Sequence, residues 1–276
     1  MSEEYTKPKL FQEITFPYRK RKGAAELNSA EKALSLLKRL GDPPYELGLK
    51  ELAEEAGIGK SGTYKLLESL RRQGFVIQDA SRKTYHLGPL VLRLGNVYSQ
   101  YKGVGDIALP VMESIMERTD QSLTLSIWEG ERAFAAYKRT RPGKVYDAID
   151  FIGKSLPINA GASAMALAAF QDPDRIRLIL EKVALEKRTP YTITDKERLL
   201  EEYEKIRNRG YSIEDEVFNL GDFSVGVPIF DRNNAVWASM ALTAPKAEAG
   251  PSNIEMWIQI LKNGAEEISD KLKFRH

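Results

Sequence analysis

The sequence GLKELAEEAGIGKSGTYKLLESLRRQG, residues 48–74, decides the fold of the N-terminal third of the chain. Its apolar residues recur every three or four positions in two runs, which indicates two short helices, at about 48–56 and 61–73. Only Gly57-Ile58-Gly59-Lys60 separates the runs, and glycine after a helix favours a sharp turn because it readily adopts left-handed backbone angles. Two short helices joined by such a turn predict a helix-turn-helix.

The preceding sequence extends this helical unit and adds a basic arm. Residues 28–40 predict a helix, which Asn28 and Glu31 open at the spacing of a capping box. Residues 1–27 show little periodicity and carry a basic run at 19–22. Two interpretations of this arm stay open: a solvated tail, or a flexible arm that adds non-specific contacts to phosphates.

A hairpin is predicted directly after the third helix. Residues 75–77 and 84–87 have the composition of two short strands, and the turn between them at 79–83 is polar and basic. Three helices followed by a hairpin predict a winged helix-turn-helix domain over residues 28–88. This is the layout of a DNA-binding module whose last helix enters the major groove of a double-stranded operator.

The exposed start of the third helix supplies the candidate DNA contacts. In helix-turn-helix modules this part of the helix meets base edges in the major groove. Lysine ammonium groups neutralise phosphates or reach guanine, and serine and tyrosine hydroxyls donate hydrogen bonds, while Ser61 is also placed to cap the helix. For the wing tip, a solvated turn is an equal alternative. The predicted DNA-binding residues are Lys60, Ser61, Gly62, Tyr64 and Lys65 on the helix, and Arg82 and Lys83 on the wing.

Charge and composition agree with this interpretation and restrict the chemistry. Residues 1–104 have a net charge of +6 and residues 105–276 a net charge of −4, as for a nucleic-acid-binding module attached to another domain, although chance scatter is an equal alternative. The chain has no cysteine and two histidines, His86 and His276. Thiolate sites, histidine triads and histidine-rich metal sites lack their residues, so we expect no catalytic residue, no metal and no cofactor.

The sequence predicts neither a membrane span nor a secretory signal. No run approaches the roughly 18 consecutive apolar residues that a spanning helix needs. Residues 1–22 lack the apolar core of a signal peptide. The cytoplasm is the expected location.

Residues 89–104 predict a helix that connects two domains. Pro89 suits its first turn, and its apolar residues form a stripe that is too wide for a solvated linker. We expect the helix to pack on a second copy of the chain in a homo-oligomer, and packing onto its own chain is the alternative. The stripe contains Leu90, Val91, Leu94, Val97, Tyr98 and Tyr101.

Residues 105–276 mix helical and strand patterns, which predicts an α+β domain built on an antiparallel sheet. Alternating apolar residues predict strands at 122–128, 132–139, 145–149, 151–152, 211–216, 224–230 and 236–243. Helical spacing predicts helices at 107–118, 159–170, 174–185, 195–209 and from 252 onwards. Thr194 and Glu197 have the spacing of a capping box for the helix at 195–209.

Several segments, in order along nearly the whole chain, resemble the isocitrate-lyase-regulator (IclR) family. The segment Glu51–Leu67 resembles the family's DNA-binding signature. The other matching segments are Tyr85–Gly88, Gly153–Ala160, Arg209–Ser212, Val227–Asp231 and the closing helix around Ile268–Ser269. The resemblance implies a dimer or tetramer that binds an operator, with a GAF-like C-terminal domain that binds a small-molecule effector.

The same resemblance implies where the effector binds. In the family the effector cavity lies between the sheet and the loop and helix that follow the Leu-Pro motif, here Leu156-Pro157. The matching positions, as implied by the resemblance, are Ala162, Ser163, Glu214, Ser224, Ala241 and Thr243. Independently, small residues at a helix start leave backbone N–H groups free for a carboxylate, although close packing of helix on sheet is the commoner reason for such residues.

Some positions depart from the family pattern. Family members often carry His at Asn159, a Gly-rich run ending in Lys at 161–165, Arg-Cys near Phe223-Ser224, and Ser at Ala241. These departures remove hydrogen-bonding groups, so the expected effector, an organic acid or aromatic metabolite, has room to be larger or more apolar than a small keto acid. Apolar residues available to line such a cavity are Leu123, Leu125, Trp128, Leu156 and Phe223, although core packing is the commoner fate of apolar strand residues.

The sequence therefore favours a DNA-binding transcriptional regulator whose operator affinity responds to a small metabolite. One alternative is a ligand-independent architectural DNA-binding protein. A second is an enzyme acting on the small molecule. Near the implied effector site, Glu214, Asp215 and Glu216 are the one dense acidic cluster, but such a run is usually a solvated strand end.

Overall fold

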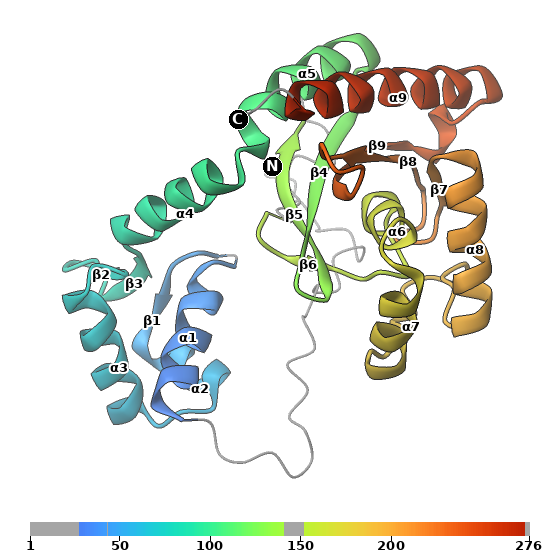
Figure 1. Cartoon of the computed structure of the whole chain (residues 1–276). Helices are drawn as coiled ribbons and strands as arrows, with labels where there is room; N and C mark the ends of the chain where they lie inside the picture. The colour runs from blue at the N-terminus through green and yellow to red at the C-terminus, as the bar shows by residue number, and fades with distance from the viewer. Residues whose placement is uncertain (1–27, 43, 141–151, 274–276) are drawn as a thin grey trace, which may run out of the picture. The chain divides into compact units, whose positions relative to one another are not determined.

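The structure, a computed structural model, describes residues 28–42, 44–140 and 152–273. The chain divides into two compact units, residues 1–102 and 103–276 (Figure 1). The basic arm expected at 1–27 and the strand expected at 145–149 lie outside the described residues. Across the described part of the chain, no helix is long and apolar enough to cross a membrane.

The N-terminal unit contains the predicted winged helix-turn-helix. Its helices are α1 (Ser29–Leu40), α2 (Leu49–Ala56), α3 (Lys60–Arg72) and α4 (Pro89–Lys102). The wing strands β2 (Val76–Gln78) and β3 (Thr84–Leu87) pair antiparallel. A two-residue strand that was not predicted, β1 (Leu47–Gly48), adds to β3 and gives the sheet order β1-β3-β2.

The helix ends of this unit follow from local sequence. Asn28 caps α1, accepting a hydrogen bond from the Glu31 backbone while Glu31 accepts one in return, as predicted. Gly57 ends α2 with φ of 63°, a left-handed angle that favours glycine. In α1, Leu36 and Leu40 are buried in the core of the unit, whereas Leu34 is 56% exposed.

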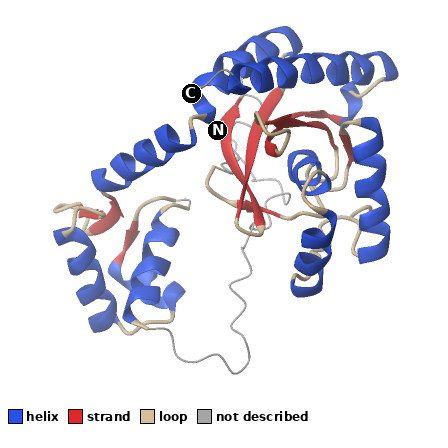
Figure 2. Cartoon of the chain, viewed as in Figure 1, coloured by secondary structure: helices blue, strands red, loops and turns tan. Residues whose placement is uncertain are grey.

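The C-terminal unit is built on a six-stranded antiparallel sheet of order β6-β5-β4-β9-β8-β7 (Figure 2). The strands are β4 (Ser122–Glu129), β5 (Arg132–Arg139), β6 (Ser155–Leu156), β7 (Ser212–Asp215), β8 (Asp222–Phe230) and β9 (Val236–Pro245). The helices are α5 (Val104–Thr119), α6 (Ala162–Ala169), α7 (Pro173–Lys182), α8 (Lys196–Arg209) and α9 (Pro251–Lys273). Helices α5 and α9 cover one face and α6 covers the other.

Alternation along the strands separates an apolar face from a face of small and polar residues. On β8, Phe223 and Val225 join the core beneath α5 and α9, whereas Ser224 and Gly226 face α6. Leu123 and Leu125 belong to the same core as Phe223. The expectation that these three residues line an effector cavity is therefore wrong, because period-two alternation turns them to the other side of the sheet; only Trp128 and Leu156 pack on the α6 side.

The cap of α8 also differs from the prediction. The side chain of Asp195 accepts a hydrogen bond from the Arg198 backbone and is the N-cap, so α8 begins one residue later than a Thr194 cap requires. Aspartate caps a helix as well as threonine and carries the charge that the helix start favours.

Candidate functional site

The start of α3 presents the predicted DNA-contacting side chains to solvent. Lys60, Ser61, Gly62 and Lys65 are exposed, and Tyr64 is 49% exposed. The next positions of the helical repeat turn inward, with Leu67 and Thr63 fully buried and the Thr63 hydroxyl donating to the Gly59 carbonyl at 3.3 Å. One face of the helix is therefore packed into the core of the unit, and the other is exposed to solvent.

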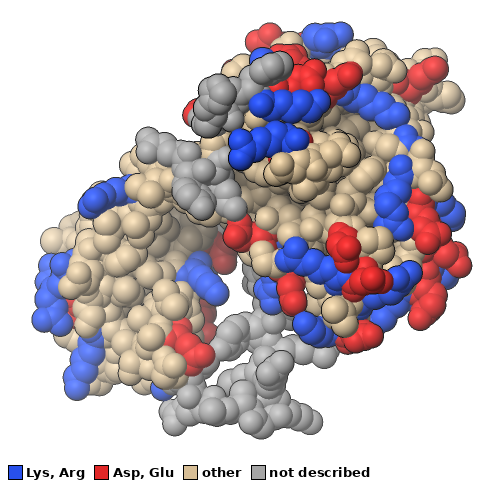
Figure 3. Space-filling view, in the orientation of Figure 1, with Lys and Arg blue, Asp and Glu red and all other residues tan. Residues whose placement is uncertain are grey.

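No side chain caps α3. Its N-cap is Gly59, which has no side chain to accept a hydrogen bond. Ser61 is the second residue of the helix. The expectation that Ser61 caps α3 is therefore wrong. The first N–H groups of a helix lack partners within the helix and attract anions such as phosphate. In the same orientation as Figure 1, Lys and Arg side chains gather along the edge of the unit that α3 forms (Figure 3).

The two basic wing residues differ in their surroundings. Arg82 forms ion pairs with Glu46 and Asp79, each at 3.0 Å. Hydrogen bonds from Ser81 and Arg82 hold the pKa of the Asp79 carboxyl well below its ordinary value, so this acceptor stays charged. Lys83 occupies the tip in a left-handed conformation with φ of 58° and is exposed.

The six residues implied for the effector site come together on the face of the sheet that α6 covers. Ala162 and Ser163 are the first two residues of α6, and the others lie on three adjacent strands. Glu214 pairs with Ser224, which pairs with Thr243, and Ala241 pairs with Gly226 in the next row. Paired residues on adjacent strands share a face of the sheet, so the residues of both rows form one surface.

Helix α6 packs very closely on this surface. A Cβ on Gly226 would lie 2.5 Å from the Ala162 carbonyl oxygen, so only glycine fits beneath the helix start. The small residues at 160–163 are thus explained by close packing, the alternative left open from the sequence. Around them the hydroxyls of Ser212 and Ser239 donate to the carbonyls of Ala162 and Ser163, both at 2.7 Å.

These hydroxyl contacts were not predicted, although the sequence contains a signal for them. Ser126 on β4 donates to the Ser163 hydroxyl at 2.9 Å, and the hydroxyls of Ser224 and Thr243 lie 3.0 Å apart. Each of these strand residues alternates with buried apolar neighbours. A polar residue at every second position of an otherwise apolar strand marks a face that is lined by hydrogen-bonding groups.

Glu214 is the charged residue at the centre of this site. Its side chain is 2% exposed and accepts a hydrogen bond from the backbone N–H of Phe218. Burial raises the pKa of the Glu214 carboxyl to about 7, and the nearby charge of Asp222 adds to the rise, while hydrogen bonding to the carboxylate opposes it. Near neutral pH this group is therefore present in both its protonated and its charged form.

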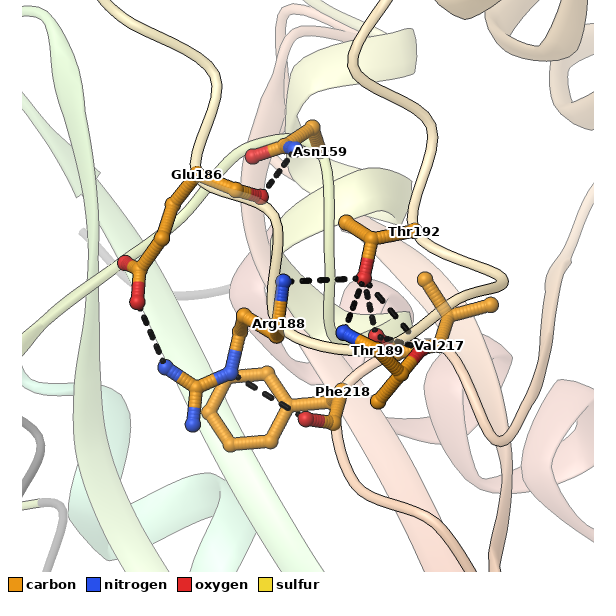
Figure 4. Close-up of polar contacts among 7 residues, drawn as sticks. All are labelled: Asn159, Glu186, Arg188, Thr189, Thr192, Val217 and Phe218. Atoms are coloured by element: carbon orange, nitrogen blue, oxygen red, sulfur yellow. Dashed lines mark hydrogen bonds and ion pairs between the residues drawn. The ribbon is translucent and has the colours of Figure 1, made fainter. Parts of the chain in front are cut away.

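A network of side chain to backbone hydrogen bonds joins the loops above the site (Figure 4). The Asn159 amide donates to the carbonyls of Glu186 and Ile193, at 2.9 and 2.8 Å. The hydroxyls of Thr189 and Thr192 donate to the Val217 carbonyl, at 3.2 and 2.7 Å. The loop at 183–195 is thereby fastened both to the segment before α6 and to the turn after β7.

Arg188 and Phe218 complete this connection. The Arg188 guanidinium lies 3.9 Å from the centre of the Phe218 ring and donates to the Phe218 carbonyl at 3.1 Å (Figure 4). The same ring lies 3.5 Å from where a Cβ on Gly161 would be, next to the start of α6. Because the Phe218 N–H bonds to Glu214, the carboxylate, the helix start and the covering loop are one connected unit.

No cluster of three or more His, Cys, Asp or Glu side chains able to hold a metal ion occurs in the described parts of the chain. The site offers hydroxyls, backbone N–H groups and one carboxylate, which bind by hydrogen bonds. The two units thus present different surfaces: an exposed helix face with basic side chains, and a buried polar site under α6.

Comparison with known proteins agrees with both units. A family model described as IclR helix-turn-helix domain matches residues 29–80, and one described as bacterial transcriptional regulator IclR C-terminal matches residues 98–270. The HTH-type transcriptional regulator KipR of Bacillus subtilis (strain 168) is 28% identical over 245 residues, which is 88% of this chain and 96% of that protein.

Solved structures show the same fold. The crystal structure of the Thermotoga maritima IclR has a TM-score of 0.74 at 29% identity, over 90% of this chain and 100% of that chain. An IclR homolog from Microbacterium hydrocarbonoxydans, complexed with 4-hydroxybenzoate, has a TM-score of 0.77 at 19% identity, over 90% and 100% of the two chains. With a family match over more than half of its length, this chain belongs to the IclR family of DNA-binding bacterial transcriptional regulators.

Proposed function

We propose that this protein binds specific DNA operators through α3 and the wing, and that a small molecule bound under α6 changes its operator affinity. One observation carries the DNA-binding role: the start of α3 is exposed, basic and without a side-chain cap. The opposite face of the same helix is buried and holds it in place. The proposed contacts are Lys60, Ser61, Gly62, Tyr64 and Lys65, with Lys83 at the wing tip. A protein with this role works in the cytoplasm, where the chromosome is.

We assign Arg82 a different part in the interface. Its guanidinium is already held by Glu46 and Asp79, so it fixes the wing strands to each other and to the segment before α2. We place the boundaries of the functional regions at 28–88 for DNA binding, 89–104 for the connecting helix and 105–276 for effector binding. We propose no catalytic role for Glu214, whose carboxyl group is buried and accepts a hydrogen bond from the Phe218 backbone.

The connecting helix α4 is the proposed contact between two copies of the chain. Leu94, Val97 and Tyr98 of the predicted stripe are 49%, 56% and 47% exposed, and Leu92 is 69% exposed. Tyr101 lies outside the described side chains. Exposed apolar side chains on one helix are typical of an interface between proteins. In the proposed mechanism, effector binding changes the spacing of the two α3 helices of a homo-oligomer and thereby the affinity for paired half-sites.

Selection of preferred sequences from random duplex DNA by the full-length protein tests the DNA-binding role. The selected duplex should bind at least about 1000-fold more tightly than scrambled duplex at physiological salt. Lys60→Ala with Lys65→Ala should abolish the preference, and Lys187→Ala, an exposed lysine of the other unit, should leave it unchanged. Equal affinity for selected and scrambled duplex would overturn the proposal.

A further inference from the structure

Helix α3 contains one glycine, Gly62, which is the third residue of the helix. Glycine inside a helix lowers stability relative to alanine, because it loses more conformational freedom on folding than any other residue. The backbone of Gly62 is not in the left-handed region, where glycine has an advantage over other residues. The conformation of α3 therefore gives no reason for glycine at this position.

Packing within the protein does not require glycine here either. Among the described residues, one atom beyond the neighbouring backbone would lie within 4 Å of a Cβ on Gly62: the Cγ2 methyl of Ile58, at 3.3 Å. A side-chain methyl can give way by a few tenths of an ångström, whereas the obstacle at Gly226 is a backbone carbonyl oxygen at 2.5 Å. Because Gly62 is exposed, the space that the absent side chain leaves is open to solvent.

The space beside Gly62 is bounded on one side by the apolar side chain of Ile58, which is half-buried. The turn between α2 and α3 holds this residue in place. The Ile58 N–H donates to the Ala53 carbonyl at 3.0 Å, and the Ile58 carbonyl accepts from the Thr63 hydroxyl at 3.4 Å. The exposed start of α3 thus has an open place of about the size of a methyl group, next to an apolar neighbour.

Duplex DNA presents a group that fits such a place. In the major groove the base edges display hydrogen-bonding atoms, and the thymine C5-methyl is the apolar group among them. Lys60 and Lys65, both exposed, give this end of α3 the positive charge that complements the phosphates on either side of a base. Given the proposed binding of DNA by α3, we propose that Gly62 and Ile58 form the contact site for the methyl group of one thymine in each operator half-site, so that the absence of a side chain at position 62 selects the base.

Exchanging a methyl group between the DNA and the full-length protein tests this assignment. Each thymine in a half-site of the selected operator is replaced in turn by deoxyuridine, which lacks only the methyl group. One of these replacements should weaken wild-type binding about fourfold. Gly62→Ala fills the contact site with a methyl group of its own. It should bind the thymine operator about tenfold more weakly than wild type does, and should bind the deoxyuridine operator more tightly than the thymine operator.

Thermal unfolding separates a binding defect from a folding defect. Alanine is the better helix former, so the Tm of Gly62→Ala should lie no more than about 2 °C below that of wild type. A larger fall would mean that packing requires the glycine, and would contradict the assignment. The matched control is Gly250→Ala, an exposed glycine of the other unit with open space around it, which should bind both operators as wild type does.

Two further results would contradict the assignment. One is that no single deoxyuridine replacement weakens wild-type binding, or that Gly62→Ala keeps the wild-type preference for thymine. The other is an equal loss of affinity of Gly62→Ala for selected and scrambled duplex, which would mean that the glycine serves close approach to the phosphates. Failure to select any operator would instead overturn the proposed DNA binding itself, so the two failures are distinguishable.

Discussion

Helices α3 and α6 begin in the same way and have opposite surroundings. Each follows a glycine, Gly59 or Gly161, whose lack of a side chain leaves the first turn uncapped. The start of α3 is exposed and lies beside basic side chains, whereas the start of α6 is buried, and the hydroxyls of Ser212 and Ser239 donate to its first carbonyls. The comparison teaches that one chemical feature, the donor-rich helix end, is open to solvent in one unit and enclosed by the protein in the other.

The largest effect is expected at α6 and depends on pH. The folded-state pKa of Glu214 is about 7, above its ordinary value of 4.5, so the folded protein binds the proton more tightly than the unfolded chain. Its contribution to the stability of the C-terminal unit is fully present below pH 4.5 and is lost as pH rises to about 7, in total roughly 3 kcal/mol. Glu214→Gln should flatten this dependence in urea unfolding measured between pH 5 and 8.

The matched control for this measurement is Glu201→Gln, an exposed carboxylate on α8, which should leave the pH dependence of stability as in wild type. If Glu214→Gln retains the wild-type slope of unfolding free energy against pH, the Glu214 carboxyl is not the group whose pKa folding raises.

The second effect is expected at α3. Lys60→Glu combined with Lys65→Glu places two negative charges where we propose that phosphates lie, and should weaken binding to the selected duplex on the order of 100-fold at low salt. Because both side chains are exposed, the Tm should stay within about 2 °C of wild type. Fluorescence anisotropy over a series of salt concentrations measures this, with Lys187→Glu in the other unit as control.

The fold was predictable where short-range sequence decides it. Gly57 with its left-handed turn, the Asn28–Glu31 capping box and the strand alternation of β4 and β8 all act within a few residues, and the structure confirms the elements they predict. The two-residue strand β1 was missed because so short a segment has no periodicity of its own, and only its pairing with β3 makes it a strand.

The site was less predictable because its contacts join distant segments. The side of the sheet on which Leu123 and Leu125 lie depends on where α5 and α9 pack, which no local pattern contains. The hydrogen bond from the Ser212 hydroxyl to the Ala162 carbonyl at the start of α6 joins residues 50 positions apart, so no local pattern predicts it. The same limit applies to the ion pair between Arg82 and Glu46, because helices α2 and α3 separate the two residues in the sequence.

A third prediction tests how closely α6 must lie on the sheet. Gly226→Ala puts a methyl group 2.5 Å from the Ala162 carbonyl oxygen, and the helix must shift because the obstacle is backbone. We expect a loss of about 2 kcal/mol in the unfolding free energy of the C-terminal unit. Gly95→Ala is the matched control, since it lies in α4 with open space around it and should be neutral or stabilising. Equal effects of the two substitutions would show that α6 does not depend on close approach to β8.

The smallest effect is expected at the wing and sharpens the comparison within the DNA-binding unit. Arg82 is shared between Glu46 and Asp79, so a phosphate would have to compete with two carboxylates for it, whereas Lys83 stands at the exposed tip. Lys83→Ala should weaken operator binding about threefold and lower the salt slope by about one unit, while Arg82→Ala should change the slope little. An equal reduction in salt slope for both variants would mean that Arg82 leaves its carboxylates for the DNA, and that the wing rearranges when it binds.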